Sequence, residues 1–303
     1  MPERSLSLSP AAIILILLAA FSHAGWNLLA KRLSAFDAVA YLWLAGLCSI
    51  ALYAPLTLIV AVTERPRFGW PQLGWTAASA GLHLAYFVLL QRGYRSGDLS
   101  LVYPLARGTG PMLSSLAAVL FLGERPGSSG IAGILLVGAG VFLLGLPDRR
   151  PATVPAATSV TSLTAVWFGL ATGLFIAGYT LWDKQGVSAL GIPPLIYNWG
   201  EEMGRAALLT PLALRRHRRD TLRVLWTTRR PYMLAVATLM PLSYVLVLTA
   251  LRFSDVSVIA PAREISVLIG VGIGGRLLAE GGLRRRLVAA AAIAGGVIAI
   301  AVG

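Results

Sequence analysis

The sequence predicts an all-α integral membrane protein with ten transmembrane helices, arranged as two inverted five-helix repeats. Of its 303 residues, 56% are hydrophobic and only 13% are charged, about half the charged fraction of an average globular protein. The apolar residues come in long blocks rather than with the period of an amphipathic helix or strand. Motifs in the first half of the chain recur in the same order in the second half.

Ten apolar blocks are long enough to cross a hydrocarbon core, which takes roughly 20 helical residues. They lie at 10–30, 38–62, 72–92, 98–122, 128–147, 162–182, 192–214, 231–251, 256–278 and 286–302. The first block follows Arg4 as in a signal peptide, but it has no convincing cleavage site, so we interpret it as a span. The segment 148–161, which contains proline and threonine, is predicted to be a linker between two domains, 1–147 and 162–303.

The net charge of +13 would suggest a nucleic-acid partner in a soluble chain. Here most arginines fall between apolar blocks, so we expect membrane lipids as partners and no nucleic acid. The segment 215–230 holds seven arginines around an apolar stripe and predicts a basic amphipathic helix at the membrane surface. The lysine and arginine bias of the loops, dominated by this segment, predicts that both termini face away from the cytoplasm. We expect a multi-pass protein of the cell (inner) membrane.

Three motifs of the first half have a counterpart in the second. They are AGWNLLAK (24–31) and AGYTLWDK (177–184), GDLSLVYPLAR (97–107) and SDVSVIAPARE (254–264), and LGE (122–124) and LAE (278–280). The only two lysines, Lys31 and Lys184, fall at matched positions and are predicted to anchor the ends of their spans. Because each repeat has an odd number of spans, the second enters the membrane inverted. Inverted repeats are typical of secondary transporters, whose substrate site lies near the midplane between the repeats.

These motifs resemble those of the EamA-type members of the drug/metabolite transporter superfamily. The resemblance is strongest in GDLSLVYPLARGTGP (97–111), in FLGERPGSSGIAGILLVGAGV (121–141), and in their counterparts SDVSVIAPARE and LLAEGG (277–282). It covers nearly the whole chain and implies two EamA-like five-helix units. It also implies a cavity lined by spans 1, 3, 4, 6, 8 and 9. For the termini it implies a cytoplasmic location, opposite to the one that the loop charges favour.

Ionisable residues deep in a span are costly unless they face a cavity or a partner, so each is a candidate functional residue. Those near the span centres, with formal charges that sum to zero, are Arg107, Glu201, Glu202, Arg205, Arg263 and Glu264. We predict an Arg107–Glu264 ion pair, because the two positions are equivalent in the repeats. Glu201 and Arg205, at i and i+4, are expected on one helix face. These charges either form a closed network that holds helices together or bind the charged ends of a substrate, to which arginine is well suited.

The predicted substrate-binding residues combine some of these charges with polar and aromatic side chains. They are His23, Trp26, Asn27, His83, Tyr86, Tyr103, Arg107, Tyr179, Tyr244, Arg263 and Glu264. At His23 and Asn27 the two repeats differ, and His23 is the titratable group nearest to neutral pH. Pro104 and Pro261 are predicted to kink their spans.

Four acidic residues near span ends are predicted to be structural. Asp98 and Asp255 precede apolar runs and are expected to cap helix N-termini. Glu124 and Glu280 end their spans, where a carboxylate opposes the helix dipole. We therefore expect them to cap the next loop or, for Glu124, to pair with Arg125.

The leading functional hypothesis is a secondary transporter or exporter of a small polar metabolite, either an amino-acid-like zwitterion or an organic anion, that works by alternating access. The sequence has no P-loop or other ATP-binding motif, so a coupling ion (a proton or sodium) or facilitated exchange would drive it. The alternatives are an integral-membrane enzyme acting on a lipid headgroup, which would need a paired acidic motif, and a non-transporting scaffold. We expect no catalytic residues, no cofactor and no metal.

Overall fold

The computed structural model describes residues 9–33, 36–96, 99–145, 163–266, 269 and 283–302, and every regular element in these ranges is a helix. The helices are α1 (Pro10–Lys31), α2 (Ala38–Glu64), α3 (Trp70–Ser96), α4 (Leu99–Phe121), α5 (Ser128–Gly145), α6 (Leu163–Ser188), α7 (Pro194–Ala213), the 3-10 helix η1 (Arg216–Arg218), α8 (Arg219–Thr228), α9 (Arg230–Phe253), α10 (Val256–Ala262) and α12 (Leu283–Val302). The all-helical prediction is therefore confirmed for the described part of the chain.

Several helices have the length and composition of membrane spans. Five of the described helices contain a segment that qualifies, namely Pro10–Ala30, Ala38–Glu64, Trp70–Gly93, Leu163–Ser188 and Arg230–Phe253. Helices α4 and α7 have 23 and 20 residues but are not among these five segments. Both contain charges predicted near the span centres. A helix satisfies its own backbone polar groups, which is what a segment in lipid requires. The chain thus has the character of a membrane protein, and the count of ten spans stays a prediction.

The described helices follow the predicted apolar blocks closely, with differences at their ends. Helix α6 continues to Ser188, beyond the predicted limit of 182. In the ninth block, 256–278, helix α10 ends at Ala262, directly after Pro261. The kink predicted at this proline is thus a helix end, as expected where a proline removes a backbone hydrogen bond.

The chain forms two compact units, and each takes residues from both halves of the sequence. Unit 1 comprises Met1–Ile13, Leu82–Leu181 and Ser254–Gly303, and unit 2 comprises Ile14–Gly81 and Trp182–Phe253. The boundaries fall inside α1, α3 and α6, so these helices contribute to both units.

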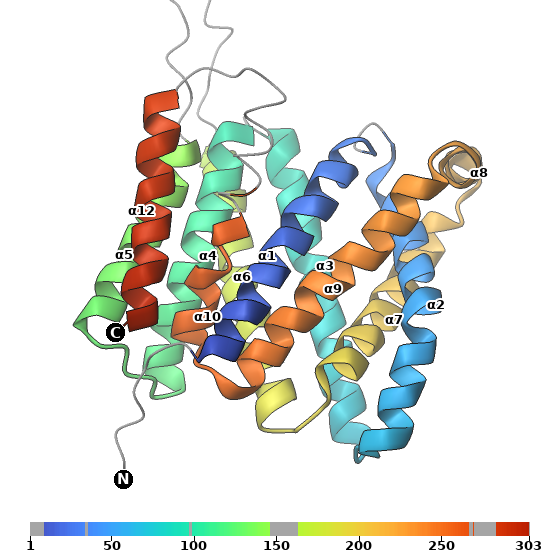
Figure 1. The fold of residues 1–303 in the computed structure, drawn as a ribbon. Helices are drawn as coiled ribbons and strands as arrows, with labels where there is room; N and C mark the ends of the chain where they lie inside the picture. The colour runs from blue at the N-terminus through green and yellow to red at the C-terminus, as the bar shows by residue number, and fades with distance from the viewer. Residues whose placement is uncertain are drawn as a thin grey trace, which may run out of the picture. The chain divides into compact units, whose positions relative to one another are not determined.

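In unit 1, α5 packs along α12, and α4 packs against α5 and α10 (Figure 1). Glycines allow the closest approach between the backbones of α5 and α12. A Cβ atom added at Gly133 would lie 2.5 Å from the carbonyl oxygen of Gly296, and one added at Gly296 would lie 2.7 Å from that of Gly133. Small residues at such positions let two helix backbones come together, which favours helix association in a membrane.

In unit 2, α2 packs against α7 and α9, and α8 lies against α2 and α9 (Figure 1). Leu225 of α8 is fully buried in a core that includes Leu33, Met233 and Val236. Most of the arginines from 215 to 230 are exposed. The amphipathic helix predicted in this segment is confirmed, whereas its contact with lipid headgroups stays a prediction.

Candidate functional site

The predicted ion pair between Arg107 and Glu264 is present in unit 1. Arg107 Nη2 lies 3.1 Å from Glu264 Oε1, and the two side chains are 13% and 3% exposed. Arg107 comes from the middle of α4, whereas Glu264 lies in the turn that follows α10, where its backbone N–H donates to the carbonyl of Pro261 (3.0 Å). The pair therefore joins the two helices that carry the GDLSLVYPLAR and SDVSVIAPARE motifs.

Arg263, also predicted to bind substrate, directly precedes Glu264 and is half-buried. With Arg107 it makes two guanidinium groups, against the one carboxylate of Glu264, so the formal charges of these three groups sum to +1. The buried ion pair thus has a second guanidinium group next to it in the chain.

Three more predicted residues form an aromatic cluster in unit 1. The rings of His83 on α3 and Tyr179 on α6 stack with their centroids 4.1 Å apart, at an angle of 30°. Tyr86, one turn after His83, meets Tyr179 edge-on with the centroids 5.7 Å apart. His83 and Tyr179 are 9% and 5% exposed. The cluster thus combines one imidazole and two phenol rings in direct contact.

In unit 2, the predicted residues of α1 contact one another. The rings of His23 and Trp26 meet edge-on with their centroids 5.0 Å apart. Asn27 Nδ2 donates to the backbone carbonyl of His23 at 2.7 Å, so its amide is engaged within its own helix. The indole N–H of Trp26 is buried, and no described residue accepts a hydrogen bond from it.

Asp183 of α6 is a buried charge that the span-centre criterion missed. Its side chain is 0% exposed, and its carboxylate accepts hydrogen bonds from Ser79 Oγ (2.7 Å), Tyr197 Oη (2.7 Å) and Tyr244 Oη. The hydroxyl of Tyr244, which we predicted to be available to substrate, is therefore bonded to Asp183. The repeat match offered a signal, because AGYTLWDK has an aspartate where AGWNLLAK has Ala30.

A second group of charges in unit 2 lies on α7. Arg205 Nη1 is 3.1 Å from Glu201 Oε1, which confirms the i, i+4 prediction, and Arg205 also pairs with Glu202. Asn198 Nδ2 donates to Glu201 Oε2 at 3.2 Å. One arginine therefore pairs with two glutamates on this helix.

The predicted role of Glu124 needs correction. Its carboxylate accepts hydrogen bonds from the backbone N–H groups of Val256 and Ser257, both at 2.8 Å, and so caps the N-terminus of α10. Asp255 is the N-cap residue, as expected, but the capping carboxylate comes from the C-terminal end of α4. Ser115 Oγ also donates to the carbonyl of Ser257 (3.3 Å).

Some predictions fall outside the described residues. These are the roles of Asp98 and Glu280, together with the side chains of Lys31, Tyr103 and Pro104. Among the residues that the structure does describe, no group of three or more His, Cys, Asp or Glu side chains could hold a metal ion.

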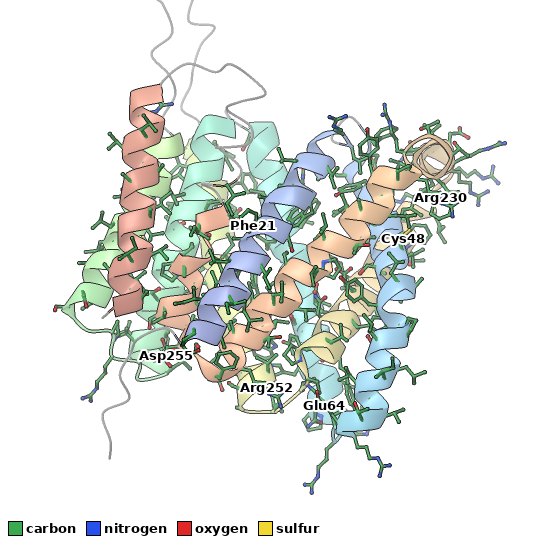
Figure 2. The ribbon with its side chains drawn as sticks, viewed as in Figure 1. Phe21, Cys48, Glu64, Arg230, Arg252 and Asp255 are labelled. Atoms are coloured by element: carbon green, nitrogen blue, oxygen red, sulfur yellow. The ribbon has the colours of Figure 1, made fainter. Side chains whose placement is uncertain are left out.

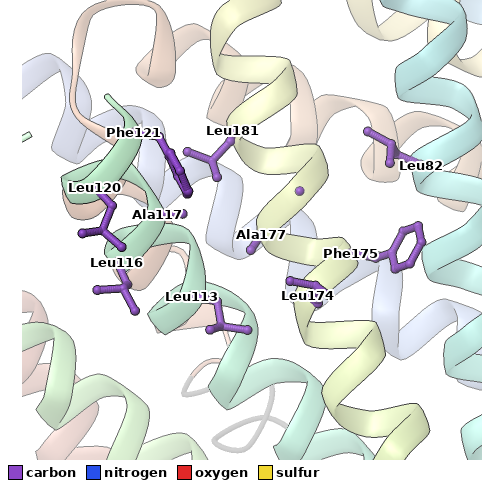
Figure 3. A pocket seen from close by; sticks show the side chains of 11 residues that line it. Leu82, Leu113, Leu116, Ala117, Leu120, Phe121, Leu174, Phe175, Ala177 and Leu181 are labelled. Atoms are coloured by element: carbon purple, nitrogen blue, oxygen red, sulfur yellow. The ribbon is translucent and has the colours of Figure 1, made fainter. Parts of the chain in front are cut away.

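An apolar cavity of 480 Å³ lies in unit 1, mainly between α4 and α6 (Figure 3). Its walls include Leu113, Leu116 and Phe121 of α4 and Leu174 and Leu181 of α6. None of the predicted substrate-binding residues lines it. Because its lining is almost entirely hydrocarbon, we do not assign the polar substrate to this cavity.

Comparisons with known proteins identify a family for the first half of the chain. Residues 10–146 match the model of the EamA-like transporter family. A solved structure titled only "Crystal structure of protein" is similar, with a TM-score of 0.71 and 18% identity over 95% of each chain, which shows a shared fold. The comparison with curated proteins found no match. Residues 10–146 are thus similar to the EamA-like transporter family, in agreement with the resemblance of the motifs to the drug/metabolite transporter superfamily.

Proposed function

We propose that the protein is a secondary transporter of a small polar metabolite with an anionic group, and that Arg107 and Arg263 bind that group. The carrying observation is the buried Arg107–Glu264 pair with Arg263 directly beside it in the chain. An arginine in a site with little water binds carboxylate or phosphate strongly through two parallel hydrogen bonds. Two arginines beside one glutamate favour an anion at this cluster.

Helix packing supports the ten-span inverted repeat that this mechanism requires. Within the two units, α4 packs against α10, α5 against α12, and α2 against α7. These are predicted spans 4 and 9, 5 and 10, and 2 and 7, so each pair joins positions that are equivalent in the two repeats. Packing of equivalent helices is expected when two inverted repeats are related by a pseudo-two-fold axis. Alternating access would then change the packing between the equivalent helices of the two repeats.

Other groups of unit 1 narrow the substrate class. Glu264 offers a carboxylate for the ammonium of a zwitterion, and the rings of His83, Tyr86 and Tyr179 suit a cation or an apolar side chain. An amino-acid-like compound would use both features, whereas an organic phosphate or phosphonate would use the arginines alone. The family description, a transporter family, favours this function over a lipid-headgroup enzyme or a scaffold.

The test combines a ligand screen with flux measurements. Purified protein is screened by thermal shift against amino acids, organic acids and phosphonates, and each stabilising compound is followed into proteoliposomes. We expect Arg107→Ala to abolish its flux. The double variant Arg107→Glu with Glu264→Arg preserves an ion pair but moves the guanidinium, so we expect it to insert and fold without transport.

A matched control is Arg252→Ala, because Arg252 and Glu64 form an exposed ion pair (4.0 Å) at one end of unit 2 (Figure 2). This variant should retain the flux. Wild-type flux in the double charge-swap variant would show that the Arg107–Glu264 pair only holds helices together, and would overturn the site assignment.

A further inference from the structure

The apolar cavity of unit 1 has no part in the proposed transport mechanism. Its 480 Å³ lies within the range of roughly 300–1,000 Å³ that is usual for small-molecule sites. Such sites normally contain a few polar groups that orient the ligand, whereas every residue that lines this cavity is leucine, alanine, phenylalanine or glycine. Apolar cavities stay free of water and take up apolar molecules. A polar substrate would lose its hydrogen bonds there, so the lining favours a hydrocarbon occupant.

The cavity lies where α4 and α6 separate (Figure 3). Nearer the N-termini of the two helices, a Cβ atom added at Gly169 of α6 would lie 2.8 Å from Leu105 Cβ. One added at Gly173, a turn later, would meet the side chain of Thr109. At Gly178, which lines the cavity, an added Cβ atom would have nothing within 4 Å. The two helices are therefore in close contact near Gly169 and Gly173 and leave open space at Gly178.

The cavity opens on the surface of the unit. Leu120, Phe121 and Leu174 belong to its lining, yet they are 65%, 80% and 61% exposed. On a membrane protein, exposed apolar side chains of this kind are expected to contact lipid chains, which are as apolar as leucine. An empty space among them would forfeit van der Waals contacts, the attraction on which packing in lipid depends. The bilayer supplies flexible acyl chains next to the opening, so one of them is suited to fill it.

A basic side chain follows the end of the cavity. Phe121 is the last residue of α4, and Gly123 (φ 69°) then turns the chain. The N–H of Glu124 donates to the carbonyl of Ala118 (3.3 Å), which keeps the exposed Arg125 close to the last turn of the helix. A guanidinium group binds phosphate through parallel hydrogen bonds. Arg125 is therefore suited to the phosphate of a lipid whose chain enters the cavity.

We propose that the cavity between α4 and α6 binds one acyl chain of a membrane phospholipid, whose phosphate group lies at Arg125. The chain enters beside Phe121 and extends between the two helices toward Leu113, near the point where they meet. It supports the C-terminal part of α4, the helix that also carries Arg107. The inference goes beyond the proposed function and does not rest on it, because a lipid would bind here whatever the protein transports.

Photolabelling tests the site. The full-length protein is placed in nanodiscs of a phosphatidylglycerol whose acyl chain carries a diazirine, and the labelled residues are located by mass spectrometry. We expect labels on Leu113, Ala117 and Ala177, which line the cavity. Ile131 and Leu135 of α5 are exposed and provide the reference for lipid at the outer surface of the unit.

Gly178→Leu fills the open space with a side chain and should remove most of the labelling in the cavity, relative to the reference residues. The matched control is Gly295→Leu on α12, which should keep it. Gly295 also has nothing within 4 Å of an added Cβ atom, and it does not line the cavity. Ala117→Phe fills the cavity from α4 and provides the test if Gly178→Leu does not fold.

Arg125→Ala tests the phosphate contact. It should lower the labelling in the cavity by roughly two- to fivefold, as expected for the loss of one exposed charge contact, and leave the reference residues unchanged. Equal labelling in this variant and the wild type would overturn the assignment of the phosphate to Arg125.

Two outcomes would overturn the acyl-chain site itself. In the first, Ile131 and Leu135 are labelled in the wild type but the cavity residues are not, so no lipid chain enters. If the protein were also a dimer in the nanodiscs, a second copy would be the occupant instead. In the second, labelling in the cavity persists in the folded filling variants, which would show that the probe reaches these residues by another route.

Discussion

Two charge clusters, one in each unit, differ in their proportions of arginine and carboxylate. In unit 1, Arg107 and Arg263 outnumber the carboxylate of Glu264, and the three formal charges sum to +1. In unit 2, Glu201 and Glu202 on α7 both pair with the one guanidinium of Arg205. A charge sum over the whole sequence hides this separation. Charge balance in a membrane protein has to be judged cluster by cluster, since a buried charge needs a partner and hydrogen bonds in direct contact with it.

The difference also predicts that the two clusters favour different ligands. A positive cluster favours an anionic substrate, whereas a negative cluster favours a proton or another cation. A transporter that binds the two ligands in separate clusters would couple them through its conformational equilibrium rather than through direct contact. Removing one charge should therefore change the stability of the two clusters by different amounts.

The largest expected difference is between Glu264→Gln and Glu201→Gln. Glu264→Gln leaves the guanidinium of Arg107 without its carboxylate, next to a second arginine, and should cost about 3–5 kcal/mol of stability. Glu201→Gln leaves the carboxylate of Glu202 paired with Arg205, so it should cost only about 1 kcal/mol. Thermal unfolding of both variants in nanodiscs measures the difference. Equal losses of stability in the two variants would contradict the different proportions of arginine and carboxylate in the two clusters.

The next prediction concerns packing, which does not depend on charge. Gly296→Ala places a methyl group 2.7 Å from the carbonyl oxygen of Gly133 and should destabilise unit 1 by about 1–3 kcal/mol. The adjacent Gly295 is the matched control, because a Cβ atom there has nothing within 4 Å. Gly295→Ala should be neutral or stabilising by up to about 1 kcal/mol, since alanine favours a helix over glycine. Similar unfolding temperatures for the two variants would refute the close approach of α5 and α12.

Much of the fold could be predicted from the sequence, because long apolar blocks determine where helices lie. The Arg107–Glu264 pair could be predicted as well, because repeat equivalence provides a long-range constraint that local patterns lack. Asp183 was missed for a specific reason. The apolar block ends at 182, but the helix continues to Ser188, where polar residues still form helical hydrogen bonds. A block of apolar residues marks the part of a helix in lipid and does not determine where the helix ends.

The role of Glu124 shows a different limit. The rule for charges at helix ends considers only the helix to which the residue belongs, and by that rule a carboxylate at the end of α4 is unfavourable. The structure brings the N-terminus of α10 next to this carboxylate, although the two segments are more than a hundred residues apart. Its partners are therefore set by tertiary packing, which no local pattern encodes.

A smaller effect tests a neutral contact of unit 2. The rings of Trp75 and Trp182 stack with their centroids 3.7 Å apart, and each Nε1 donates to the backbone carbonyl of the other residue at 2.9 Å. Trp75→Phe keeps an aromatic ring but removes one of the two hydrogen bonds, so the loss should be about 1 kcal/mol. Trp167→Phe is the control, since Trp167 is 60% exposed. Thermal unfolding checks both, and a larger effect at Trp167 would contradict the role of the reciprocal hydrogen bonds.

The smallest expected effect lies outside the apolar segments, at Asp37. Its carboxylate caps α2 by accepting from the N–H of Ala40 (2.9 Å) and also accepts from Arg218 Nε (2.8 Å). Burial by itself would raise the pKa of Asp37, but the hydrogen bonds from Arg218 and Ala40 and the charge of Arg218 outweigh it and hold the pKa below its ordinary value of 3.8. The ionised form thus stabilises the folded state above that value. This stabilisation disappears as the pH falls through the lowered pKa.

Asp37→Asn should therefore lower the unfolding temperature slightly at neutral pH and have no effect in strong acid. The difference stays small because the Asp37 side chain is 36% exposed and salt screens the pair. Asp220→Asn, at an exposed position of α8, is the control and should leave the unfolding temperature at neutral pH unchanged. Unfolding temperatures measured across the acidic range would contradict the pairing if Asp37→Asn and the wild type differed by a constant amount at every pH. Convergence in acid would instead show that unit 2 also uses a carboxylate at its surface, where water lowers the free-energy cost of a charge.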